Sequence, residues 1–290
     1  MFSLDLLLNA ILAGLLLGGF YAAVSLGVSI AFGLLDVVNI AHPAFVVLGS
    51  YVAYAMNDAF GVDPLVTGML GIPVFFALGV LVYRLYYVGF ERTGEESLRG
   101  LVFFFGILFI VEVSLLLKYG VDYRMVETSY IGGSFHIGPV GIAPRLLVPF
   151  VVGVVMTSAL YLVLSKTFYG RAIMAVSQDS QALRLLGANP VRIKTIAFGL
   201  AIATASVAGA LMIIIGPVEP AIGREYIGRV FAVAVLGGMG SVGGTLLAAV
   251  ILGVAESLTS TFSGPSWSLA VSFGILLGVL AVRRSGLFGR

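Results

Sequence analysis

The sequence contains no cysteine and only two histidines, His42 and His136. Without cysteine the chain forms neither disulfides nor thiolate metal sites, and it has no thiol nucleophile. Two histidines are too few for a multi-histidine metal centre. No GxxxxGK[ST] segment occurs either, so the chain has no recognisable P-loop for a nucleotide. We therefore expect no catalytic residues, no metal and no cofactor in this chain.

Charge is equally scarce. Charged residues make up 10% of the 290 residues, against about 25% in soluble domains, while 60% of the residues are hydrophobic. A chain of this composition cannot cover a water-facing surface, so we predict an integral membrane protein in contact with lipid. The net charge of +2 is too small to indicate a nucleic-acid partner.

About 20 apolar residues span the hydrocarbon core of a bilayer. Eight segments fit this length: Leu6–Leu35, Val37–Asn57, Pro64–Tyr83, Gly100–Leu117, Leu146–Ser165, Thr195–Val218, Val230–Ala255 and Ser257–Val282. The stretches between them are too short for soluble domains. The acidic start Met1–Asp5 followed by a long apolar run differs from a signal peptide and predicts a retained helix. We expect an all-α, polytopic protein with a single membrane domain over residues 1–290.

The loops differ in charge, which predicts their side of the membrane. Basic residues concentrate in Tyr83–Arg99, in Lys166–Lys194 and in the tail with Arg283, Arg284 and Arg290. Such loops are usually cytoplasmic. We therefore place these three stretches, and the C-terminus, in the cytoplasm, and the acidic positions Asp58 and Asp63 outside. The longer stretch Lys118–Arg145 is also placed outside.

A glycine-rich run, Leu236–Gly244, interrupts one apolar segment. Three full crossings after Lys194 would leave the basic tail outside, whereas a re-entrant Val230–Ala255 would return it to the cytoplasm. On this interpretation Ser241–Gly244 is buried in the bundle, and Glu225 and Ser260 both lie on the outer side. Irregular backbone at membrane depth needs protein or water around it. We take four positions as candidates for the translocation pathway: Gly237, Gly238, Gly240 and Ser241.

The first half has a similar interruption at Asp36–Pro43, where Pro43 breaks the helical pattern. Interrupted segments in both halves of a transporter point to its central site. Asn39 and His42 are therefore further pathway candidates, although an interfacial loop explains the pattern equally well. For His42 a hydrogen-bonded structural role is favoured over a proton relay. Two acidic residues stand out in apolar sequence: Glu256 is expected at a solvated helix end, and Glu112 has either a pathway or a structural role.

Three blocks carry a family resemblance: Leu17–Ala23 with Val38–His42, Gly170–Ala172 with Gln178–Asp179 and Leu185–Gly187, and Leu236–Ser241 with Gly253–Ser257. Together they resemble the shorter, high-affinity type of branched-chain amino acid permease in bacterial ABC importers. The resemblance implies an inner-membrane permease that is not itself an enzyme. It also implies three kinds of partner: a second permease subunit (identical or different), two ATP-binding subunits, and an extracytoplasmic substrate-binding protein.

Two alternatives stay open at this point. Related ABC permeases for urea, short amides or sugars share much of the pattern. An ion-coupled secondary transporter is a different class, which needs a coupling-ion site, and only Glu112 is a deep candidate for one.

The loop at about 166–194 is predicted to carry a short helix over Ser180–Leu186. Asp179 is a suitable N-cap, Gly187 suits the left-handed C′ position, and Asn189-Pro190 begins the next helix. Its apolar face, Ala182, Leu185 and Leu186, needs a surface to pack against, because so short a helix is unstable alone. The membrane or the protein's own bundle would serve. The resemblance implies a groove on the ATPase, with the coupling residues Arg171, Gln178, Asp179, Ala182, Leu185, Leu186 and Gly187.

Overall fold

The computed structural model describes residues 4–93, 96–137, 140–282 and 286. The α-helices of this part are α1 (Leu4–Leu35), α2 (His42–Phe60), α3 (Pro64–Leu70), α4 (Ile72–Gly89), α5 (Glu96–Tyr119), α6 (Pro144–Lys166), α7 (Phe168–Gln178), α8 (Ser180–Leu185), α9 (Pro190–Ile215), α10 (Gly223–Leu236), α11 (Val242–Ser263) and α12 (Ser268–Val282). Two short 3₁₀ helices, η1 (Glu91–Thr93) and η2 (Pro265–Trp267), and an antiparallel hairpin of β1 (Phe135–Ile137) and β2 (Val140–Ile142) complete them. The predicted all-α class is confirmed.

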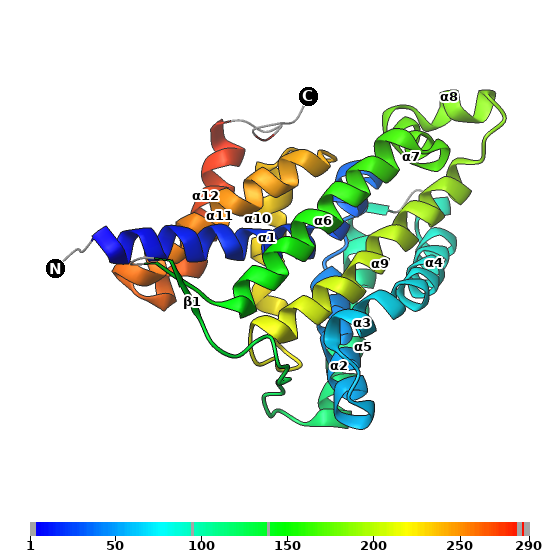
Figure 1. Ribbon diagram of the computed structural model, residues 1–290. Coiled ribbons are helices and arrows are strands. Elements are labelled where there is room, and N and C mark those ends of the chain that lie inside the picture. Colours follow the sequence, from blue (N-terminus) through cyan, green and yellow to red (C-terminus); the bar gives the residue numbers. More distant parts are fainter. Residues whose placement is uncertain (1–3, 94–95, 138–139, 283–285, 287–290) are drawn as a thin grey trace.

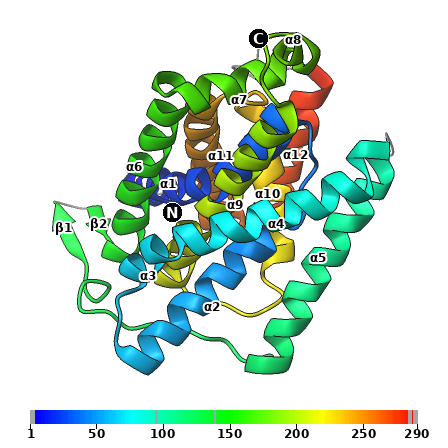
Figure 2. The same ribbon diagram turned by 90° about the vertical axis from the view of Figure 1, so that its right-hand side faces the viewer.

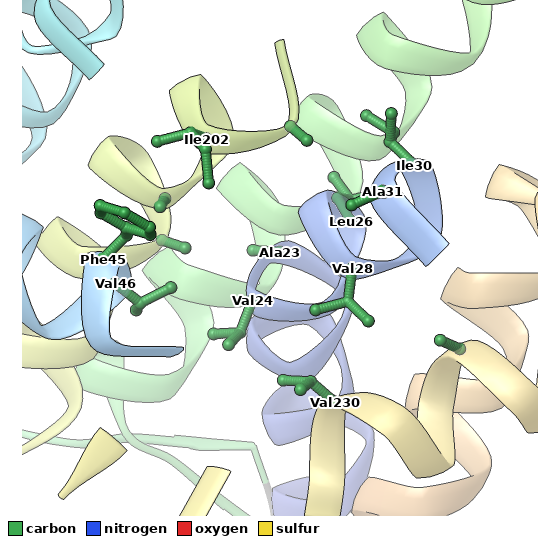
Figure 3. Close-up of a cluster of buried hydrophobic side chains, with 14 of the residues drawn as sticks. Ala23, Val24, Leu26, Val28, Ile30, Ala31, Phe45, Val46, Ile202 and Val230 are labelled. Carbon is green, nitrogen blue, oxygen red and sulfur yellow. The ribbon is translucent and has the colours of Figure 1, made fainter. Parts of the chain in front are cut away.

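Helices α1 and α9 form the centre of the molecule (Figure 1). Each is apolar around its whole circumference, as expected of helices that other helices surround on all sides. Helix α1 packs against α6, α9 and α11, and α9 packs against α1, α2 and α4. Figure 3 shows side chains of α1, α2, α9 and α10 meeting there, among them Val24, Leu26, Phe45, Ile202 and Val230, all buried.

Small residues let α1 and α11 approach closely. A Cβ atom added at Gly18 would lie 2.6 Å from the Cα atom of Val250, and one added at Gly253 would lie 2.5 Å from the carbonyl oxygen of Gly14. Real Cβ atoms do not come so near to backbone, so these positions accept only glycine without a shift of the helices. Close backbone approach through small residues is the usual means of packing helices in a membrane.

Seven helices of the described residues are long and apolar enough to cross a membrane, or eight if a bent pair counts as one span. In that pair, α2 and α3, the helix axis bends by 119° at the break, a bend that the sequence did not predict. Gly61, with φ of 65°, ends α2, and the Asp63 carboxylate caps α3 by accepting the Leu65 N–H at 2.8 Å. The predicted segment Pro64–Tyr83 is consequently divided between α3 and α4.

The glycine run forms the turn between α10 and α11. Gly238 and Gly240 both have φ of 81°, and the Ser241 hydroxyl caps α11 by accepting the Gly244 N–H at 3.1 Å. Gly240 packs against Gly33 near the end of α1. Met239 is 47% exposed, and Ser241 is only half-buried. The expected burial of all of Ser241–Gly244 is therefore wrong, because the run turns at one end of the bundle.

From Pro190 to Val282 the chain forms four α-helices, α9 to α12, where the sequence indicated three apolar segments, one of them re-entrant. The α10–α11 hairpin brings the chain back, so that α8 and the end of α12 lie at the same end of the molecule, with the α2–α3 junction at the other (Figures 1 and 2). A return of the chain was correctly expected, but its geometry is a helical hairpin. The predicted boundary at Glu256 is also wrong, since α11 runs through this residue to Ser263.

Candidate functional site

The predicted pathway residues of the first half lie inside the protein. Asn39 and His42 are 1% and 0% exposed, which contradicts an interfacial loop. The His42 Nε2 atom lies 3.1 Å from the Val24 carbonyl oxygen, and its ring fills the space beside Gly27, where a Cβ atom would come within 2.1 Å of it. This hydrogen bond agrees with the structural role favoured for His42. Within the described residues, Nδ1 of His42 and Nδ2 of Asn39 have no hydrogen-bond partner.

The predicted pathway residues of the second half lie at a different place along α1. Gly237 and Gly238 are buried, Gly240 and Ser241 half-buried, and the run touches Gly33 rather than Gly27. Six residues of helix separate these two contacts, or about 9 Å at 1.5 Å per residue. The structure therefore does not bring the two predicted groups together around one centre.

The interior contains a charged network around Glu256, a residue that was expected at a solvated helix end. The Glu256 side chain is 4% exposed, so the expectation of a solvated helix end is wrong. Its carboxylate accepts the Tyr21 hydroxyl at 2.5 Å and the Arg229 Nε–H at 3.1 Å, and it is also hydrogen-bonded by Ser272. The Arg229 guanidinium in addition lies 5.2 Å from the ring centre of Tyr226. A buried carboxylate is tolerated here because an arginine and two hydroxyls satisfy it.

Four different helices supply this network: α1, α10, α11 and α12. Each contributes one or two polar groups, and the α10–α11 turn brings Arg229 to Glu256. The residues are up to 251 positions apart in the chain. Local sequence patterns do not predict contacts between residues so far apart. A carboxylate and an arginine in neighbouring apolar segments nevertheless indicate a possible ion pair.

A cavity of about 280 Å³ opens beside this ion pair. We call it the Glu256 cavity; its lining is Ala13, Leu17, Tyr21, Leu146, Arg229, Glu256, Ser257, Ser260, Thr261 and Ser268. Its lining combines apolar side chains, the opposite charges of Arg229 and Glu256, and hydroxyl groups. We call Ser260, Thr261 and Ser268, which are half-buried or exposed, its rim. A space of this size is near the lower limit of ligand pockets, about 300 Å³, and suits a small molecule.

Glu112 is engaged in a second ion pair. Both of its carboxylate oxygens accept hydrogen bonds from Arg224, at 2.7 and 2.8 Å, and the Arg224 guanidinium also lies 4.9 Å from the ring centre of Phe109. This contact connects α5 to the start of α10. Among the described residues, no group of three or more His, Cys, Asp or Glu side chains is placed to hold a metal ion.

The predicted helix in the loop at about 166–194 is confirmed as α8. The Asp179 carboxylate accepts the N–H groups of Gln181 and Ala182 at 2.8 and 2.9 Å, and Gly187 has φ of 81°. The Asn189 side chain accepts the Arg192 N–H at 3.2 Å, which starts α9 as expected.

Helix α8 projects from the rest of the molecule (Figure 2). It contains no buried residue, and Leu185 and Leu186 are 89% and 82% exposed. Ala182 is also exposed, and so are Arg171 and Gln178 of the preceding helix α7. Of the three surfaces considered for the apolar face of α8, the described part of the protein's own bundle is therefore excluded.

Polar contacts join α4, η1 and the start of α9 close to α8. The Lys194 Nζ atom donates to Glu91 at 2.7 Å, and the Tyr83 hydroxyl donates to the other Glu91 oxygen at 2.7 Å. A cavity of about 270 Å³ separates this pair from Ser180 and Arg184 of α8. The two basic stretches Tyr83–Arg99 and Lys166–Lys194 thus meet at the same end of the molecule.

Comparison with known proteins agrees with these features. A family model described as "Branched-chain amino acid transport system / permease component" matches residues 10–280. The high-affinity branched-chain amino acid transport system permease protein BraD of Pseudomonas aeruginosa is 29% identical, over 98% of this chain and 96% of the relative. The corresponding protein LivH of Escherichia coli (strain K12) is 28% identical, over 96% of this chain and 94% of the relative.

A second type of permease is more distantly similar: LivM of Salmonella typhimurium is 25% identical, over 92% of this chain and 67% of the relative. No solved structure matches the chain. Because the family model covers nearly the whole sequence, the chain belongs to the family of branched-chain amino acid transport system permease components.

Proposed function

We propose that this chain is one permease subunit of an ATP-driven importer that carries branched-chain amino acids across the inner membrane. Two ATP-binding subunits supply the energy, a second permease subunit completes the membrane part, and an extracytoplasmic binding protein delivers the substrate. The family supports the transport role, and the names of BraD and LivH support the substrate. The similarity to LivM supports a second permease of a different sequence.

The observation that carries the ATPase assignment is the exposed apolar face of α8. The last residue of this six-residue helix, Leu185, and its C-cap, Leu186, are both more than four-fifths exposed. So short a helix gains stability when another surface covers its apolar residues. Laying apolar anchors of a helix into a groove is a common way to join two proteins. The loop at about 166–194 then lies in the cytoplasm together with Tyr83–Arg99 and the C-terminus, as its basic residues favour.

In this arrangement residues 1–290 form a single permease domain, and the coupling surface is built from Arg171, Gln178, Asp179, Ala182, Leu185, Leu186 and Gly187. The break at Asn39–His42 lies within the bundle. The break at Gly237–Ser241 lies at its cytoplasmic end. Both are candidates for segments that move when the pathway opens, since irregular backbone resists displacement less than a continuous helix.

Replacing both exposed leucines by aspartate, L185D/L186D, tests the assignment. The variant retains the caps of α8 and disturbs no buried contact, so we expect it to insert normally and to lose the ATPase on purification. The matched control L185M/L186M keeps an apolar face of similar volume and should retain the ATPase. Normal stoichiometry of the ATPase on L185D/L186D, with uptake still driven by ATP, would refute the coupling role.

Uptake into vesicles separates the transport classes. Labelled leucine should accumulate only when ATP is present on the side of the membrane that carries the ATP-binding subunits. An ionophore should leave this accumulation unchanged. Accumulation without ATP that collapses with an ion gradient would instead identify an ion-coupled transporter. Import of urea or a sugar in place of leucine would keep the transporter class and overturn the substrate.

A further inference from the structure

We propose that the Glu256 cavity is a transient binding site for the charged head of the transported amino acid, with Arg229 facing its carboxylate and Glu256 its ammonium group. The inference rests on the proposed function and assigns to it a substrate site inside a single subunit. The Arg229–Glu256 pair, 3.1 Å apart in the lining of the cavity, carries it.

The charges of the cavity select for a zwitterion. Arg229 and Glu256 are 13% and 4% exposed, so both are largely removed from water. A ligand with one charge would satisfy one member of the pair and leave the other buried without a partner, which is strongly unfavourable. A ligand with adjacent ammonium and carboxylate groups can engage both members and keep the site neutral.

The hydrogen bonds to Glu256 hold it in place for such an exchange. The Tyr21 hydroxyl at 2.5 Å and the Ser272 hydroxyl fix the carboxylate from α1 and α12. Arg229 is held against the Tyr226 ring at 5.2 Å. Because these supports come from the protein itself, an ammonium group can approach Glu256 without the network collapsing.

The wall and the volume of the cavity suit an aliphatic side chain. Ala13 and Leu17 of α1 and Leu146 of α6 form its apolar side, and its volume is about 280 Å³. An apolar wall beside paired charges matches a molecule with an aliphatic group at one end and a zwitterion at the other. Urea has no aliphatic part, and a sugar has neither an aliphatic side chain for the apolar wall nor charges for Arg229 and Glu256.

The position of the cavity fits entry from outside. Its rim residues Ser260, Thr261 and Ser268 lie at the end of α11 and the start of α12. The glycine turn at the start of α11 packs against the C-terminal end of α1. Helix α8 lies towards the same end of the molecule as this turn (Figure 1). With α8 in the cytoplasm, as proposed, the rim faces the side from which the binding protein delivers substrate.

The first test changes the size of the cavity without touching its charges. Ala13→Leu adds three carbons to the apolar wall, and the matched control Ala159→Leu adds them at an exposed position of α6. Maximal ATP-driven uptake is measured with saturating, loaded binding protein, so that delivery does not limit selection. We expect A13L to lower the ratio of leucine uptake to valine uptake about 10-fold, because one methylene in a tight pocket typically changes discrimination by at least that factor. A159L should leave the ratio unchanged.

The second test fills the rim from outside. The chain has no cysteine, so Ser260→Cys can be labelled with a bulky, membrane-impermeant thiol reagent, with Ser263→Cys as the control at the exposed end of α11. Labelled S260C should lose at least 10-fold in leucine uptake relative to labelled wild-type complex, whereas labelled S263C should not.

Two results would overturn the site. If A13L slows leucine and valine equally, or if labelled S260C imports leucine at the unlabelled rate, the pair is a structural ion pair only. Neither result bears on the proposed function, which fails separately if the unmodified complex shows no ATP-driven leucine uptake.

Discussion

Removing the positive charge of the buried pair should destabilise the protein by a predictable amount. In R229M the Glu256 carboxylate keeps Tyr21 and Ser272 but loses its counter-ion at 4% exposure. Breaking a buried pair in this way typically costs about 3–5 kcal/mol. We therefore expect R229M to lose about 3–5 kcal/mol of unfolding free energy.

A double variant should distinguish this cause from lost packing. R229M/E256Q removes both charges and should unfold within about 1 kcal/mol of the wild type, because no charge remains buried alone. A defect of packing at position 229 would persist in the double variant.

Unfolding in mixed detergent micelles, followed by circular dichroism and by the fluorescence of the single tryptophan, Trp267, measures these differences. The control R84M replaces an exposed arginine of α4 and should change stability by less than about 0.5 kcal/mol. Equal stability of R229M and R84M would show that the buried pair contributes nothing and would refute the reasoning.

Two further substitutions test the packing of α1. Gly18→Leu places a side chain where even a Cβ atom would lie 2.6 Å from the Cα atom of Val250. It should lower the unfolding free energy by at least about 3 kcal/mol or prevent folding. Gly106→Leu on α5, where a Cβ atom has open space around it, should be tolerated. Asp36 adopts the left-handed conformation that ends α1, with φ of 56°, so Asp36→Gly should raise the unfolding free energy by about 0.5–1 kcal/mol.

Thermal unfolding of the purified chain measures both effects. A G18L variant as stable as G106L would mean that α1 and α11 do not pack closely. A neutral or destabilising D36G would mean that the Asp36 side chain contributes more at this position than its backbone conformation costs.

Local signals in the sequence were sufficient for α8. Asp179, Gly187 and Asn189 are the residues that make the capping contacts, and each acts on atoms two or three positions away. The central role of α1 and α9 also follows from their apolar composition. Signals of this kind are reliable because neighbours in the sequence are also neighbours in the structure.

The arrangement of the second half did not follow from the sequence. Counting apolar residues merged α10 with part of α11, because 14 residues of α10 are too few to register as a separate span. Glu256 was then taken as the boundary between two segments. Its true surroundings depend on α1, α10 and α12, which reach it only after the bundle has formed.

A rule based on charge balance would have come closer. Hydrocarbon tolerates an isolated charge poorly, so every carboxylate in an apolar segment needs a basic partner at its own depth. Arg224 and Arg229 are the two basic residues at the start of α10, and five residues at 100° each place them about 140° apart around the helix. They must therefore serve different neighbours. The structure pairs Arg224 with Glu112 of α5 and Arg229 with Glu256 of α11, so the two acidic residues that were considered singly are matched through one short helix.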